Sequence, residues 1–79
     1  MGDLEKFLEI VSTVFSIAPE SIKDELTPDE IDKWDSVTHM ELLSNFEKVF
    51  GVTFDMEEIS EMQSIGVVKK LLAKKGLKL

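Results

Sequence analysis

The chain has 79 residues and no cysteine, which suits one small domain, 1–79, and excludes disulfide bonds and thiolate metal sites. Its sixteen acidic residues outnumber nine lysines and give a net charge of −7; because such a chain repels phosphate backbones, we expect no nucleic-acid partner. It lacks the apolar run of about 18 residues that a membrane span needs and the basic start of a secretion signal, so we expect a cytoplasmic protein.

The first predicted element is a helix over residues 4–15. Asp3 stands directly before it and is the expected N-cap. The apolar residues of this segment follow the three-and-four spacing of one helical face. They are Leu4, Phe7, Leu8, Val11, Val14 and Phe15. We expect this face to pack against the core.

Residues 16–35 hold both prolines of the chain and lose the helical spacing, which predicts a long first loop. The segment "TPDE", residues 27–30, has the character of one short turn. Trp34 is expected to fix the end of the loop in the core. Other apolar residues are expected to hold the loop along its length: Ile17, Ile22, Leu26 and Ile31. Loops of this length in a small domain are often functional.

A second helix is predicted from Asp35 or Ser36 to the residue before Gly51, which suits a C-cap. One broad arc of this helix is apolar and is expected to be buried. It consists of Met40, Leu42, Leu43, Phe46, Val49 and Phe50. Val37 falls on the opposite, polar arc, where an apolar residue cannot face the core. His39 is expected at the edge of the buried face.

Two further helices are predicted after Gly51. Asp55 with Glu58 is a capping-box pattern that opens a short helix over residues 56–61. Ser64 can cap the last helix, which Gly76 ends. The buried face of this last helix is expected to be Ile65, Val68, Leu71 and Leu72. Since no strand pattern appears, the expected fold is all-α, a bundle of three main helices plus one short helix.

The charge of the chain is unevenly distributed. Residues 1–66 hold all sixteen acids and four lysines, whereas residues 67–79 hold five lysines and no acid. The acidic part should attract basic protein surfaces, and the lysines complement the dipole of the last helix. The acids of the loop do not form an EF-hand, because Ile31 and Trp34 stand where that motif needs an acid and a glycine. We therefore expect no metal site.

Few residues of this chain could carry out catalysis. Ser36 and His39 are three residues apart on one predicted helix, but nothing identifies an orienting acid or an oxyanion hole. A small hydrolase is therefore only a formal alternative, and we expect no catalytic residue and no enzyme. Ser36 itself has two interpretations. It caps the second helix, together with Asp35, or it is a chemical handle.

The tripeptide "DSV" at residues 35–37 is followed by "HMELLSNFEKVFGVTF" and "DMEEISEMQSIGVVKKLL". In these segments, and more loosely over the whole chain, the sequence resembles the acyl carrier proteins. The motif of that family is Asp-Ser-Leu followed by an apolar, glutamate-containing helix that ends in Phe-Gly. Matching positions are held by Asp35, Ser36, Glu41, Leu42, Glu47, Phe50 and Gly51, with Val37 in place of the leucine. The segment "WDSVTH" is also similar to stand-alone carriers of specialised pathways.

The resemblance implies that Ser36 receives 4′-phosphopantetheine from coenzyme A, transferred by a separate phosphopantetheinyl transferase with Mg²⁺. The thiol of this arm would carry acyl or aminoacyl groups as thioesters. Implied partners are an acyl ligase or acyltransferase and downstream acyl-processing enzymes of a fatty acid, polyketide or other specialised pathway. A monomeric four-helix carrier is the form that the resemblance implies.

The resemblance also implies a face for partner recognition. Val37 would be its exposed apolar contact, and Asp35, Glu41 and Glu47 would meet basic residues of the enzymes. The acids of the short helix, Glu57, Glu58 and Glu61, would extend this face. The alternative function is an unmodified acidic helical module that binds a basic partner, in which Ser36 has no chemical role.

Overall fold

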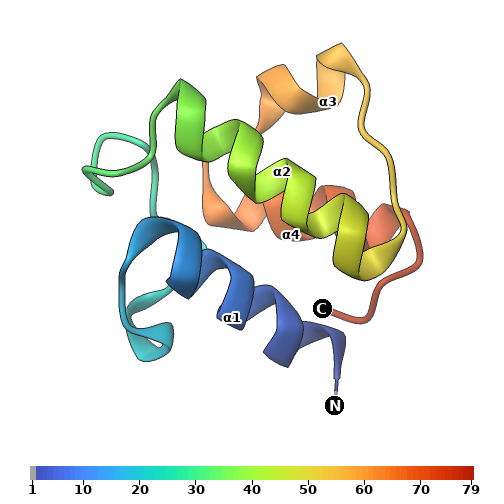
Figure 1. The fold of residues 1–79 in the computed structure, drawn as a ribbon, viewed down its shortest axis with the longest axis horizontal. Coiled ribbons are helices and arrows are strands. Elements are labelled where there is room, and N and C mark those ends of the chain that lie inside the picture. Colours follow the sequence, from blue (N-terminus) through green and yellow to red (C-terminus); the bar gives the residue numbers. More distant parts are fainter. Residues whose placement is uncertain (1) are drawn as a thin grey trace.

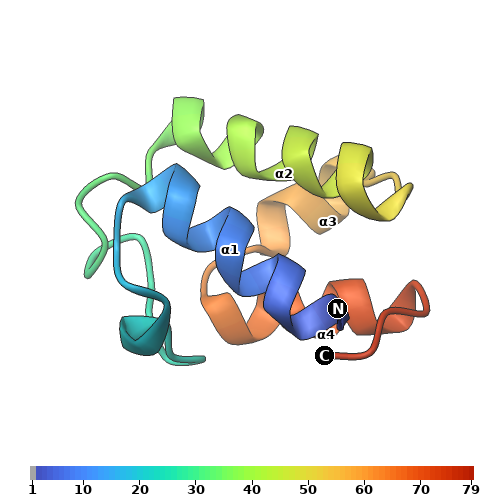
Figure 2. The same cartoon turned by 60° about the horizontal axis from the view of Figure 1, so that its bottom comes forward.

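A computed structural model describes residues 2–79 and shows a bundle of helices (Figures 1 and 2). Helix α1 spans Asp3–Phe15, the 3-10 turn η1 Pro19–Ser21, α2 Ser36–Phe50, α3 Met56–Glu61 and α4 Ile65–Lys74. No strand occurs in the described residues, and the predicted all-α fold with one short helix is confirmed. None of these helices combines the length and the apolarity required to cross a membrane.

The helices begin and end at residues suited to those positions. The carboxylate of Asp55 caps α3 in a reciprocal bond pair with Glu58, as predicted. The hydroxyl of Ser64 caps α4 by accepting from the Val67 N–H over 3.2 Å. Gly51 ends α2 with φ +67°, a left-handed conformation that glycine adopts without steric cost.

The predicted cap of α1 is wrong. Gly2 is the N-cap, without a side-chain bond, and Asp3 is the first residue of the helix. The Asp3 carboxylate accepts instead from the backbone N–H of Lys78 over 2.9 Å. Its distant partner in the chain could not be foreseen from the local pattern. This bond places the two ends of the chain side by side, remote from the beginning of α2 (Figures 1 and 2).

The core is built around the contact of α1 with α2. Phe7 of α1 and Phe46 of α2 stack with their ring centroids 5.6 Å apart. The buried residues are Phe7, Val11, Phe15, Ile31, Trp34, Leu42, Leu43, Phe46, Met62, Ile65, Val68, Leu71 and Leu72. The predicted buried face of α4 is confirmed. The buried arc of α2 is narrower than predicted, because Met40 and Val49 lie at its edges and are about half exposed.

The long loop is held to the rest of the molecule by apolar and polar contacts. Ile31 and Trp34 are buried in the core, as predicted, and the turn at Thr27–Glu30 is present. The carbonyls of Leu26 and Asp24 accept from the first two N–H groups of α4, those of Ile65 at 2.9 Å and Gly66 at 2.8 Å. These N–H groups have no partner inside their own helix, so the loop satisfies them. The turn η1 was not predicted.

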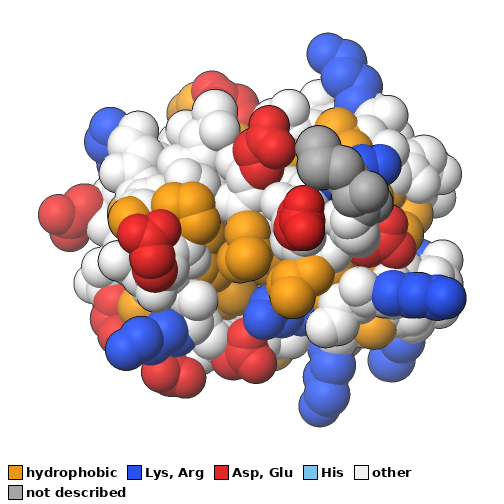
Figure 3. Space-filling model, turned by 90° about the horizontal axis from the view of Figure 1, so that it is seen from below, with side chains coloured by type: hydrophobic (Ala, Val, Ile, Leu, Met, Phe, Trp, Pro, Cys, Tyr) orange, Lys and Arg blue, Asp and Glu red, His pale blue; other side chains and the backbone are white. Residues whose placement is uncertain are grey.

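Two of the five C-terminal lysines form ion pairs with the acidic part of the chain. Lys69 pairs with Asp24 at 2.8 Å, and Lys75 pairs with Glu58 at 3.0 Å. The space-filling view shows the face of the molecule seen from below, with apolar side chains in its middle and acidic and lysine side chains around them (Figure 3). The lysines therefore contribute specific contacts as well as the general complement to the dipole of α4.

Candidate functional site

The beginning of α2 is fixed by Asp35 and Thr38. Oδ1 of Asp35 accepts from the N–H groups of Val37 and Thr38, both at 3.0 Å. The Thr38 hydroxyl in turn accepts from the Asp35 N–H over 2.9 Å and donates to the Lys33 carbonyl. The Thr38 N–H bond, together with the Thr38 hydroxyl and the Val37 N–H, holds the pKa of Asp35 below its usual value, against a smaller opposing effect of desolvation. Asp35 is therefore an ionised N-cap at neutral pH.

Ser36 is the first residue of α2 and not its cap, because Asp35 takes that role. The Ser36 side chain is exposed. Its hydroxyl makes no hydrogen bond to residues 2–79, in contrast to the hydroxyls of Thr38 in the same first turn and of Ser64 at the start of α4. The interpretation of Ser36 as a helix cap is thus wrong.

An open groove of about 430 Å³ lies beside Ser36. It runs between the start of α2, the end of the long loop and α3, and most of its surface is apolar. Trp34, Met40, Ile59 and Met62 supply apolar walls, and Ser60 and Gln63 supply polar ones. The sequence did not indicate this groove, because its walls come from three segments whose contacts are set by the folded chain.

His39 connects two of these walls. The indole N–H of Trp34 donates to Nδ1 of His39 over 2.9 Å, and Nε2 of His39 lies 3.3 Å from the carbonyl oxygen of Ile59 in α3. The predicted place of His39 at the edge of the buried face is confirmed, since its side chain is half-buried. Both ring nitrogens are occupied, so neither can accept a proton from Ser36. This arrangement argues against a Ser36–His39 hydrolase.

The residues predicted for partner recognition are all exposed, at the N-cap of α2 and along the helix. Val37 is 67 % exposed, a high value for an apolar side chain, and Asp35 and Glu41 are exposed within one turn of it. Glu47 is also exposed, but it stands about three turns further along the helix. The four residues therefore form a stripe and not a single cluster.

Two more apolar residues are exposed, one in α2 and one in α3, although the sequence did not predict either. Met40 is 56 % exposed and Met56, the first residue of α3, is 79 % exposed. The spacing of α2 predicts Met40 on the buried arc, while Met56 directly follows the predicted cap Asp55, a place where exposure is common. No group of three or more acidic or histidine side chains in residues 2–79 is arranged to hold a metal ion.

Comparison with known proteins gives two findings. Residues 5–72 match the model of a family described as a phosphopantetheine attachment site. The fold is similar to the solution NMR structure of a holo acyl carrier protein from Geobacter metallireducens, with a TM-score of 0.81 and 28 % sequence identity. The alignment covers 95 % of this chain and 86 % of that one. The comparison with curated proteins gives no match.

Proposed function

This chain belongs to the acyl carrier protein family, whose members are carriers with covalently attached phosphopantetheine and not enzymes, and on that premise we propose that Ser36 is the attachment residue. The protein then delivers acyl or aminoacyl groups between biosynthetic enzymes. The observation that carries this proposal is the free, exposed hydroxyl of Ser36 beside an apolar groove. A carrier site needs such an oxygen, whereas a structural serine at a helix start would bond to the backbone.

In the attachment step, Oγ of Ser36 forms a bond to the phosphorus next to the pantetheine of coenzyme A. The bond from that phosphorus to the bridging oxygen breaks, 3′,5′-ADP leaves with this oxygen, and the Ser36 proton passes to a base of the transferase. The chain itself supplies only the nucleophile and its placement. Asp35 fixes the direction of the helix start through its bonds to the Val37 and Thr38 N–H groups.

The surroundings of Ser36 fit the attached group. The positive end of the α2 dipole favours a phosphodiester at this position. Since Asp35 already accepts the N–H groups of Val37 and Thr38, we expect the phosphate to extend outward and not to be held against the helix end. The apolar walls of the groove offer a surface for the remainder of the arm. When bound, phosphopantetheine supplies a thiol on which acyl groups travel as thioesters.

The proposed partners are a phosphopantetheinyl transferase, an acyl ligase or acyltransferase, and downstream acyl-processing enzymes. We assign their contact to the exposed stripe of α2: Val37 provides the apolar contact, and Asp35, Glu41 and Glu47 provide charge for basic residues. The net charge of −7 supports this assignment, because an acidic carrier approaches a basic enzyme surface faster than a neutral one.

We propose a specialised pathway for this carrier, on the likeness of "WDSVTH" to carriers of that kind. The two residues that distinguish this segment, Trp34 and His39, are hydrogen-bonded to each other. An acyl-adenylate-forming ligase and a malonyl transferase of fatty acid synthesis can be compared as loading enzymes, with the product identified by mass. Faster loading by the malonyl transferase would contradict the proposal.

The attachment itself is tested by intact mass after incubation with coenzyme A, Mg²⁺ and a broad-specificity transferase. We expect one phosphopantetheine on the wild type and none on Ser36→Ala. Ser44→Ala is the matched control, since Ser44 is an exposed serine of the same helix, and it should be modified like the wild type. If the wild type stays unmodified while a known carrier in the same reaction is modified, the unmodified interaction module becomes the better explanation.

A further inference from the structure

We propose that His39 is a positioning residue that holds α3 against the start of α2 in its neutral form, and that protonation of His39 releases this wall of the groove. The contact that holds α3 is inferred from the geometry of Trp34, His39 and Ile59 alone. Any effect of this release on an arm attached to Ser36 rests on the proposed function, in which Ser36 carries phosphopantetheine.

The hydrogen bonds of His39 specify one tautomer. The indole N–H of Trp34 can only donate, so Nδ1 of His39, 2.9 Å away, must accept. The ring proton of neutral His39 therefore sits on Nε2, where it donates to the carbonyl of Ile59 at 3.3 Å. One imidazole ring thus links the loop to α3. It does so with each nitrogen in a fixed role.

Protonation is incompatible with this arrangement. In the imidazolium form both nitrogens carry a hydrogen, so the Nδ1–H of His39 would meet the N–H of Trp34 head-on. One ring must turn away. Trp34 is 6 % exposed and packs against Phe15 with ring centroids 5.1 Å apart, whereas His39 is only half-buried. We therefore expect His39 to turn and to give up the bond to Ile59.

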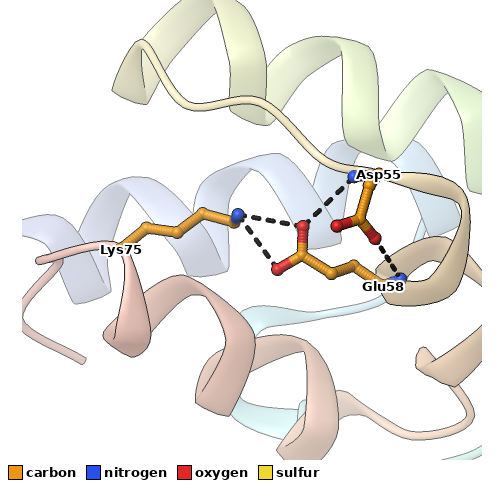
Figure 4. A network of polar contacts seen from close by, with 3 residues as sticks. All are labelled: Asp55, Glu58 and Lys75. Atoms are coloured by element: carbon orange, nitrogen blue, oxygen red, sulfur yellow. Dashed lines mark hydrogen bonds and ion pairs between the residues drawn. The ribbon is translucent and has the colours of Figure 1, made fainter.

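Helix α3 depends on such contacts more than the other helices do. It has six residues, and none of its side chains is buried. A helix of this length is not stable by itself. On the side of α4 it is held by Lys75, which bonds to Glu58 (Figure 4). On the side of α2 the bond from His39 to Ile59 is the corresponding polar contact. Its loss leaves α3 attached through Glu58, through the half-buried Ile59 side chain packed against the core, and through the buried Met62 that follows.

Other titratable and charged groups lie on the elements around His39. They are Asp32, Lys33 and Asp35 in the loop, Glu41 in α2, Glu57, Glu58 and Glu61 in α3, and Lys75 after α4. Carboxylates outnumber lysines in this set. Titration of these carboxylates is the other possible source of a pH effect on α3. A variant that keeps the bonds without titrating separates the two effects.

His39→Gln is that variant. Its amide oxygen can accept from Trp34 and its amide N–H can donate to Ile59, but it does not gain a proton in the range where histidine does. His39→Leu places an apolar side chain of moderate size at this position and removes both bonds. Comparison of the two variants separates the effect of the hydrogen bonds from the effect of side-chain size.

The test uses the full, unmodified chain and solvent-exchange NMR of the α3 amides between about pH 5.5 and 8. With rates corrected for intrinsic pH dependence, we expect α3 of the wild type to lose protection at low pH by about fivefold, the factor corresponding to one hydrogen bond. His39→Gln should stay protected throughout, and His39→Leu should show the same reduction of about fivefold at every pH. The amides of α1 should not change in any of the three.

A wild-type α3 that is unaffected by pH would overturn the proposal, as would equal pH dependence in His39→Gln, which would assign the effect to carboxylates. Nitrogen chemical shifts that place the proton on Nδ1 would overturn it as well. These measurements need no phosphopantetheine. A protein that fails to be modified at Ser36 can therefore still show the pH response, and the failure of one proposal is distinguishable from the failure of the other.

Discussion

Lys75 Nζ lies 3.0 Å from each carboxylate oxygen of Glu58, seventeen residues earlier in the chain (Figure 4). The same carboxylate accepts from the Asp55 N–H at 3.1 Å, so Glu58 closes the cap of α3 and ties that helix to α4 at once. Lys75 also lies over the ring of Phe54, 5.2 Å from its centroid. About four-fifths of each of the two charged side chains is shielded from solvent.

We expect Lys75→Met to lower the free energy of unfolding by roughly 1 kcal/mol, because a shielded ion pair is worth more than an exposed one. Urea unfolding measures this change. Lys70→Met is the matched control, since Lys70 is exposed and forms no ion pair within residues 2–79, and it should be nearly neutral. Equal losses in both variants would show that only net charge matters.

The N-cap of α2 makes the free energy of unfolding depend on pH, and the pKa of Asp35 determines the direction of this dependence. Hydrogen bonds, first of all from the Thr38 N–H, lower the pKa of Asp35 in the folded chain. Its contribution to stability is therefore complete above the usual aspartate pKa of about 4 in the unfolded chain, and it disappears as the pH falls through the lower folded value. Asp35→Asn should be less stable than the wild type at pH 6, with the difference shrinking toward about pH 3.

Urea unfolding at a series of pH values checks this prediction. Asp29→Asn serves as control, because Asp29 is an exposed aspartate of the same loop without a side-chain bond to the described residues. Its difference from the wild type should be small at every pH. An Asp35→Asn difference that grows on acidification would contradict the assignment of Asp35 as an ionised cap.

Two apolar residues of α2, two positions apart, should respond very differently to truncation. Leu42 is fully buried, and Leu42→Ala should cost about 2–5 kcal/mol through lost burial and a cavity. Met40 is 56 % exposed, and Met40→Ala should cost less than about 1 kcal/mol. Thermal and urea unfolding of both variants measure the difference. Similar costs would mean that Met40 is buried after all.

The exposed stripe of α2 should matter for partners and not for folding. Glu41→Lys is expected to lower kcat/KM of the transferase about tenfold, mainly by raising KM, and to do so most at low salt. Glu9→Lys makes the same change in net charge on the exposed side of α1, and we expect a much smaller effect. An equal effect of the two variants would assign recognition to overall charge and not to α2.

The helix boundaries could be predicted because the residues that set them act locally. Asp55 with Glu58, Ser64 and Gly51 each determine one helix end through bonds or dihedral angles within a few positions, and the structure confirms all of these ends. Asp3 is the exception, since its carboxylate bonds to Lys78 at the other end of the chain. A long-range partner overrides a local preference without leaving any trace in the nearby sequence.

The width of the buried face of α2 could not be predicted from the local sequence in the same way as the helix ends. Spacing along α2 indicated its direction correctly, with Leu42 and Phe46 at the centre, but the exposure of Met40 and Val49 depends on how far neighbouring helices reach. The bond between Trp34 and His39 was unpredictable for a similar reason. It requires the particular path of the loop that brings an indole back over the first turn of α2.

The bond between Asp3 and Lys78 has a practical consequence. Both chain ends lie on one side of the bundle, and the first turn of α2 lies at the opposite end (Figures 1 and 2). A bead, sensor chip or fluorophore joined through either end would stand away from Ser36, so enzymes could approach an immobilised carrier without obstruction. The fold thus suits a solid-phase format in which successive enzymes are washed over a tethered intermediate and each product is read from the support.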